Sequence, residues 1–157
     1  MKRLALTTAS ISVLLLVAST ATGAVNARLQ GAFQVTATVT KSDSTEPGTQ
    51  VERTYKFKPL CDQGVCEKVR ISRESSTGVF VKTVLKKTSK GTYKGKEVQK
   101  KPVCADGSKA ESRTGDIVAK IVKQDGGKAT KVKGTVKLDT KGCPEGTFTD
   151  AKYVGTR

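Results

Sequence analysis

Residues 131–138 read Lys-Val-Lys-Gly-Thr-Val-Lys-Leu, so that apolar or small residues alternate strictly with polar ones. A period of two places the valines, the glycine and the leucine on one face and the lysines and the threonine on the other. This pattern is typical of a β-strand that buries one face and exposes the other to water. The segment therefore predicts a strand, and its repetition along the chain predicts the fold class.

Seven further segments alternate in the same way or are rich in strand-forming residues. They are residues 33–40, 51–57, 69–71, 79–87, 93–103, 117–121 and 148–154. Turn signals such as Glu46-Pro47-Gly48 and Asp125-Gly126-Gly127 separate them. We therefore expect an all-β fold, a single antiparallel meander of about eight strands. A β-barrel is preferred over a sandwich, because closure removes edge strands and the connections are short.

Residues 1–24 are predicted to form a secretory signal peptide. Lys2 and Arg3 give a charged start, and the apolar run 11–18 follows. This run is shorter than the roughly 20 apolar residues of a membrane-spanning helix, which argues against an uncleaved anchor. Small side chains permit cleavage after Gly23, Ala24 or Ala27.

Cleavage after Ala24 is favoured, and it divides the chain into a signal peptide, a short N-terminal linker at residues 25–30 and a β-barrel-like domain at residues 31–157. This organisation predicts a secreted or extracellular protein. Association with the cell envelope is an alternative that the sequence leaves open. After cleavage we expect no transmembrane segment and a monomer.

The four cysteines lie in the exported part of the chain, at Cys61, Cys66, Cys104 and Cys143. An even number of cysteines in an oxidising compartment predicts two disulfides, with three possible pairings. The order along the chain favours Cys61 with Cys66 and Cys104 with Cys143. A four-cysteine zinc site is the rival interpretation, but the spacings lack the paired short knuckles that such sites use.

Composition argues against catalysis. The chain has no histidine, which removes the usual base of serine and cysteine nucleophiles and the most common metal ligand. The acidic residues are mostly isolated in loops, and paired cysteines offer no thiolate. We therefore predict a protein that is not an enzyme and that has no cofactor and no metal site.

Positive charge is the strongest functional signal. Removing Lys2 and Arg3 lowers the formal charge from +15 to +13, which is large for about 130 residues. Nine lysines occupy polar positions on four successive predicted strands: Lys82, Lys86, Lys94, Lys96, Lys100, Lys120, Lys131, Lys133 and Lys137. This lysine-rich face predicts binding to anionic polymers of the cell envelope or extracellular matrix. The simpler alternative is a solvated face that serves solubility.

Base-specific nucleic-acid binding is not expected, because arginines are few and no aromatic cluster offers a stacking platform. The predicted function is a non-enzymatic binding or surface-interaction module.

Two charged residues interrupt the inward pattern and suggest an alternative, a small-ligand carrier that uses the barrel interior. Arg53 shares a face with Val51 and Tyr55, and Glu97 shares one with Tyr93. A buried arginine must be paired. One interpretation places Arg53 near a barrel end, and the other pairs it with Glu97 inside the barrel, where both would orient a ligand beside Tyr55 and Tyr93.

A third hypothesis is a protease inhibitor that presents the loop between Cys61 and Cys66.

The run Gly31-Ala32-Phe33, the segment 53–61 and the ending from Cys143-Pro144-Glu145-Gly146 to Tyr153 resemble small, uncharacterised exported β proteins of actinobacteria. The resemblance implies an exported β-barrel-like domain with two disulfides, and it implies no activity. Gly31-Ala32-Phe33 is also similar to the lipocalin opening, in which tryptophan stands in place of Phe33.

Overall fold

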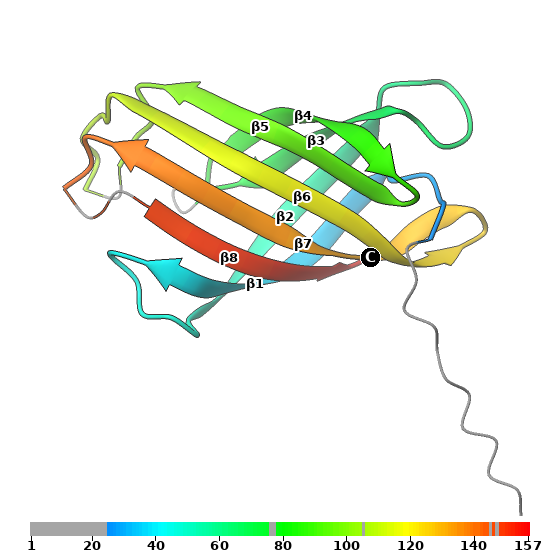
Figure 1. Cartoon of the computed structure of the whole chain (residues 1–157), viewed down its shortest axis with the longest axis horizontal. Helices are drawn as coiled ribbons and strands as arrows, with labels where there is room; N and C mark the ends of the chain where they lie inside the picture. The colour runs from blue at the N-terminus through cyan, green and yellow to red at the C-terminus, as the bar shows by residue number, and fades with distance from the viewer. Residues whose placement is uncertain (1–24, 76–77, 105, 145, 147) are drawn as a thin grey trace, which may run out of the picture.

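The computed structural model describes residues 25–75, 78–104, 106–144, 146 and 148–157. Each strand pairs with the next in antiparallel fashion, and β1 also pairs with β8, which closes the sheet into a barrel (Figure 1). The all-β class, the meander and the barrel are therefore confirmed. The strands are β1 (Gly31–Ser42), β2 (Gln50–Pro59), β3 (Lys68–Glu74), β4 (Phe80–Ser89), β5 (Thr92–Lys100), β6 (Ser112–Asp125), β7 (Lys128–Lys141) and β8 (Phe148–Thr156).

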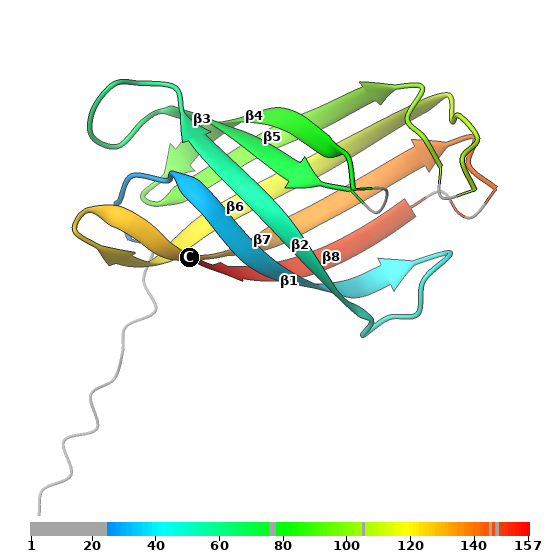
Figure 2. The same ribbon diagram turned by 180° about the vertical axis from the view of Figure 1, so that it is seen from behind.

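The barrel has two different ends, which Figure 1 and Figure 2 show from opposite sides. Residue 25, the C-terminus and the turns after β2, β4 and β6 lie at one end, called here the terminal end. The connections that follow β1, β3, β5 and β7 lie at the other, called the loop end. The fifth strand ends at Lys100, three residues before the predicted end, and the remaining connection belongs to the loop end.

The terminal end is closed by a packed core. Phe33 and Phe57 meet edge to face with ring centroids 5.5 Å apart, and Leu85 and Ile121 are fully buried beside them. Aromatic pairs of this geometry add to the stabilisation from area burial alone. The side chains described at this end therefore form part of a buried hydrophobic core.

Residues of the segment 25–30, which the sequence suggested as a short linker, pack against the core at the terminal end. The side chains of Ala27 and Leu29 are each 1% exposed and belong to the core. Between them, the Arg28 backbone N–H donates to the Gly127 carbonyl at 2.8 Å. Apolar side chains two apart can enter the core together when the backbone is extended and hydrogen-bonded.

An inward glycine makes space for a large ring in the middle of the barrel. As predicted, Gly134 shares the inner face with Val132 and Val136, and Tyr153 lies opposite it. A Cβ at Gly134 would collide with the Val118 carbonyl and lie 2.6 Å from the Tyr153 hydroxyl oxygen. That hydroxyl donates to the Val118 carbonyl oxygen at 2.8 Å, which satisfies the buried phenol.

Among the strand pairs of the barrel, β4 and β5 have the fewest paired residues. These strands pair near their turn only, at Lys86 with Lys94, Lys87 with Tyr93 and Ser89 with Thr92. Continuing the register would place Thr83 opposite Glu97, but no pairing is formed there. We call this unpaired stretch the β4–β5 seam.

Both predicted disulfides are confirmed. Cys61 is bonded to Cys66 in the turn after β2, and Cys104 is bonded to Cys143, joining two connections at the loop end. Two disulfides are typical of a protein that folds in an oxidising, extracellular environment. The described residues include no helix with the length and apolar character to cross a membrane.

Candidate functional site

A cavity of about 420 Å³ occupies the loop end of the barrel. Its walls come from β1, β2, β3, β6, β7 and β8. The apolar lining residues are Ala37, Val39, Val51, Val136, Leu138 and Ala151. The rim includes Ser44 and Cys143, so the disulfide to Cys104 constrains the cavity mouth.

A buried ion pair adjoins the cavity, because its arginine, Arg73, is one of the residues that line it. The Arg73 Nη2 donates to both carboxylate oxygens of Glu97, at 2.8 and 3.0 Å, and the two residues are 6% and 1% exposed. Arg73 comes from β3 and Glu97 from β5, so the pair bridges the two strands on either side of β4. It lies beside the β4–β5 seam, where Thr83 Oγ1 is buried and finds no hydrogen-bond partner among the described residues.

The interpretation that pairs Arg53 with Glu97 is wrong, because Arg73 is the partner of Glu97. Arg53 instead lines the cavity nearer the loop end, where its Nη1 donates to the Glu52 carbonyl oxygen at 2.8 Å. This agrees with the interpretation that placed Arg53 near a barrel end. The signal for Arg73 was present in the sequence, since it continues the inward alternation of Val69 and Ile71.

The polar side of the cavity combines a phenol with arginines. Tyr55 lies directly opposite Arg73 across β2 and β3, and its ring meets Tyr153 at 5.1 Å between centroids. Burial raises the pKa of Tyr55, although the positive charges of Arg73 and Arg53 oppose the shift. Tyr55 therefore remains a neutral hydroxyl at physiological pH. A third arginine, Arg113, lines the same cavity, and its Nε donates to Thr140 Oγ1 at 2.9 Å.

The four residues suggested for an interior ligand site do not gather in one place. Arg53 and Tyr55 line the cavity. Glu97 is not a lining residue, and it is bonded to Arg73, which is one. Tyr93 belongs to the closed terminal end, where its hydroxyl donates to the Cys66 carbonyl oxygen at 3.0 Å. Burial, and secondarily the charge of Glu67, raises the pKa of Tyr93.

The nine lysines of the predicted face all lie outside the barrel. Lys120 and Lys131 are half-buried, and the other seven are exposed: Lys82, Lys86, Lys94, Lys96, Lys100, Lys133 and Lys137. Part of this face carries acidic neighbours, because the register places Lys96, Asp116, Lys137 and Asp150 in one row. The Lys137 Nζ lies 4.0 Å from a carboxylate oxygen of Asp150. Charge is therefore partly balanced on β5 to β8.

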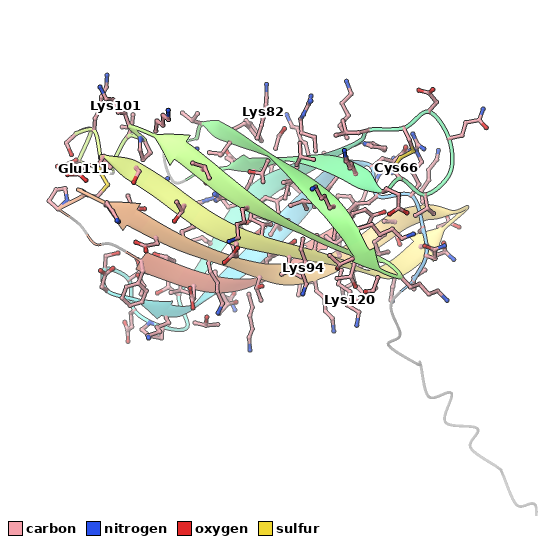
Figure 3. The ribbon with its side chains drawn as sticks, turned by 45° about the horizontal axis from the view of Figure 1, so that its top comes forward. Cys66, Lys82, Lys94, Lys101, Glu111 and Lys120 are labelled. Carbon is pink, nitrogen blue, oxygen red and sulfur yellow. A yellow bond between two sulfur atoms is a disulfide. The ribbon has the colours of Figure 1, made fainter. Side chains whose placement is uncertain are left out.

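Sequence reasoning missed four basic residues on β2 and β3 that adjoin the β4 lysines: Lys56, Lys58, Lys68 and Arg70. The register puts Lys68 opposite Lys86, and Lys86 opposite Lys94. Figure 3 shows Lys82 pointing away from the wall in this region. The available signal was that Lys56 and Arg70 lie at outward positions of predicted strands and that Lys58 and Lys68 lie directly beside those strands.

The loop between Cys61 and Cys66 is mostly exposed, and hydrogen bonds from Arg28 hold its backbone. The two terminal nitrogens of Arg28 donate to the carbonyl oxygens of Gly64 and Cys61, both at 2.9 Å. The loop is thus constrained, and protease inhibition stays a prediction.

Within the described part of the chain, no group of three or more potential ligands could hold a metal ion. Comparisons with models of protein families, with curated proteins and with solved structures give no match. The arguments for function therefore rest on the cavity and on the surface charge.

Proposed function

We propose that this protein binds a small amphiphilic molecule in its loop-end cavity and acts as an extracellular carrier. The observation that supports this most is the volume of about 420 Å³, since ligand pockets usually measure about 300–1,000 Å³. A lumen packed throughout would have favoured surface binding alone. The small-ligand alternative therefore moves ahead of the polymer-binding hypothesis.

The lining suggests how such a molecule is oriented. Its apolar body packs against Val39, Val51 and Val136, and its polar end faces Tyr55 and the arginines. The closed barrel and the disulfide at the rim hold the cavity in shape before binding, which lowers the ordering cost of association.

The test fills the cavity and measures binding of a fluorescent amphiphile, anilinonaphthalene sulfonate. Ala37 is buried and lines the cavity, so Ala37→Leu is expected to weaken probe binding at least about tenfold by occupying its volume. Ala32→Leu is the matched control, because Ala32 is exposed on the outside of the same strand. Near-ultraviolet circular dichroism checks that both variants are folded.

Equal probe affinity in the two variants would place binding outside the cavity and contradict the proposal. Absence of binding to the unmodified protein would do the same. Ala151→Leu repeats the test from β8 if Ala37→Leu fails to fold.

A further inference from the structure

The outer surface of β2 to β5 carries a dense group of basic residues that extends from the middle of the barrel to its terminal end. We call it the β2–β5 basic face, and it consists of Lys56, Lys58, Lys68, Arg70, Lys82, Lys86 and Lys94. All seven are exposed. This face overlaps the predicted lysine-rich face only on β4 and β5.

A row of three directly opposed lysines distinguishes this face. Like charges also face each other on β6 and β7, but only in pairs, Lys120 with Lys133 and Lys123 with Lys131. Lys68, Lys86 and Lys94 form one row across three strands, and Lys58 lies opposite Arg70 in the next. Neighbouring strands are about 4.8 Å apart, and alternate residues along a strand about 6.7 Å. Like charges directly opposite each other destabilise a sheet. The folded barrel therefore retains a repulsion that a bound anion would relieve.

Acidic side chains do not neutralise the face. On β2 and β3 they are Glu52 and Glu74, both toward the loop end, where Glu52 accepts a hydrogen bond from Thr36 and Glu74 accepts one from the Thr54 backbone N–H. Glu67, just before β3, forms an ion pair with Lys87, whose Nζ lies 3.3 Å from a carboxylate oxygen of Glu67. Among the ion pairs of the described residues, none includes a member of the face. Lys56 lies over the Phe80 ring, which leaves its positive charge in place.

We propose that the β2–β5 basic face binds a linear phosphate-bearing polymer, whose chain crosses the strands along Lys68, Lys86 and Lys94. Lysine ammonium groups bind phosphate as point charges, without the bidentate geometry that arginine imposes. A row of closely spaced ammonium groups suits successive phosphates of a flexible chain. The face lies on the outer wall, so this inference is independent of the loop-end cavity.

Two triple variants of equal charge change test the assignment. Long-chain inorganic polyphosphate is titrated against the mature protein, the variant Lys68→Gln/Lys86→Gln/Lys94→Gln and the variant Lys131→Gln/Lys133→Gln/Lys137→Gln. The first variant is expected to lose at least about tenfold in affinity at low salt. The logarithm of its affinity should decrease less steeply with the logarithm of the salt concentration. The magnitude of the slope should be smaller by about two, as expected when three ammonium contacts are lost. The second variant should lose less than about threefold, since Lys137 has Asp150 beside it.

Stability provides a second measurement that an unfolded variant would fail. Without polymer, the first variant should unfold at a higher urea concentration than the unmodified protein, because opposed like charges are gone. Equal losses of affinity in the two variants would overturn the proposal, because they would mean that the polymer is attracted by the overall charge without a specific site. A larger loss in the second variant would also overturn it, because it would place the site on β6 and β7. Polyglutamate that binds as tightly as polyphosphate would overturn the choice of phosphate.

Discussion

At the scale of single residues, the Arg73–Glu97 pair supports the barrel where backbone pairing is missing. It joins β3 to β5 across the inside of β4, beside the seam where Thr83 and Glu97 would otherwise face each other. Charges this deeply buried are costly unless they are paired. The pair therefore connects β3 to β5 where backbone pairing between β4 and β5 is short. Its arginine, Arg73, also lines the cavity.

Removing one partner of this pair should be far worse than removing both. Arg73→Met leaves the Glu97 carboxylate buried without a counterion, at an expected cost of about 3–5 kcal/mol in the free energy of unfolding. The double variant Arg73→Met/Glu97→Leu should recover most of that loss. Urea denaturation of the two single variants and the double variant completes the cycle. A small effect of Arg73→Met alone would mean that the pair does not support the seam.

The three tyrosines make stability sensitive to high pH. Burial raises the pKa of Tyr55, Tyr93 and Tyr153 above the ordinary value of 10.0. Because the folded state keeps these protons longer than the unfolded state, this contribution to stability is complete below about pH 10 and is lost as pH rises further.

Tyrosinate absorbance should therefore appear at higher pH in the folded protein than in urea. Ionisation of all three side chains at the same pH in both states would contradict this prediction.

At the scale of strands, alternation in the sequence predicted which segments form the barrel and which side of each faces inward. Gly134 and Glu97 both face inward as the pattern required. Register could not be predicted, because it depends on pairing between distant segments. Hence the alternative that paired Arg53 with Glu97 named the wrong arginine, and the acidic neighbours of Lys96 and Lys137 were not foreseen. The cavity volume depends on how side chains fill the barrel, which periodicity does not encode.

The two disulfides should differ in their effect on stability. The bond between Cys104 and Cys143 spans 39 residues, and that between Cys61 and Cys66 spans 5. Chain entropy gives about 4 kcal/mol for the longer loop and about 2 kcal/mol for the shorter. Replacing both cysteines of each pair by serine and measuring thermal unfolding tests this order. The reverse order would show that contacts of Arg28 with the shorter loop matter more than loop length.

Packing of the segment before β1 bears on signal-peptide cleavage. Val25 packs against the core and Ala27 is buried, so cleavage after Ala27 would remove core contacts. We therefore expect export to leave Val25 as the first residue, as cleavage after Ala24 requires. Mass spectrometry of the exported protein gives its N-terminus directly. A chain that begins at Arg28 would contradict the expectation and should be less stable.

At the scale of the whole molecule, the cavity and the basic face occupy different surfaces. The cavity opens at the loop end, whereas the β2–β5 basic face lies on the outer wall from the middle of the barrel to its terminal end. A protein held to an anionic polymer through this wall would keep its cavity mouth accessible. The two proposals are compatible, and each can fail without the other.

The net charge makes the whole barrel sensitive to salt in a direction that can be predicted. Residues 25–157 carry a formal charge of +13, and the described residues include one buried and two surface ion pairs. Repulsion among lysines should therefore outweigh attraction between exposed opposite charges.

Raising sodium chloride from about 0.01 M to 0.15 M shortens the screening length from about 30 to 8 Å and weakens that repulsion. The urea midpoint should consequently rise with salt, and urea is used because it carries no charge. The Lys68→Gln/Lys86→Gln/Lys94→Gln variant should gain less from the same addition, since its row of three opposed lysines is already absent. A midpoint that falls with salt would mean that attractive pairs dominate the surface, and it would remove the stored repulsion on which polymer binding depends.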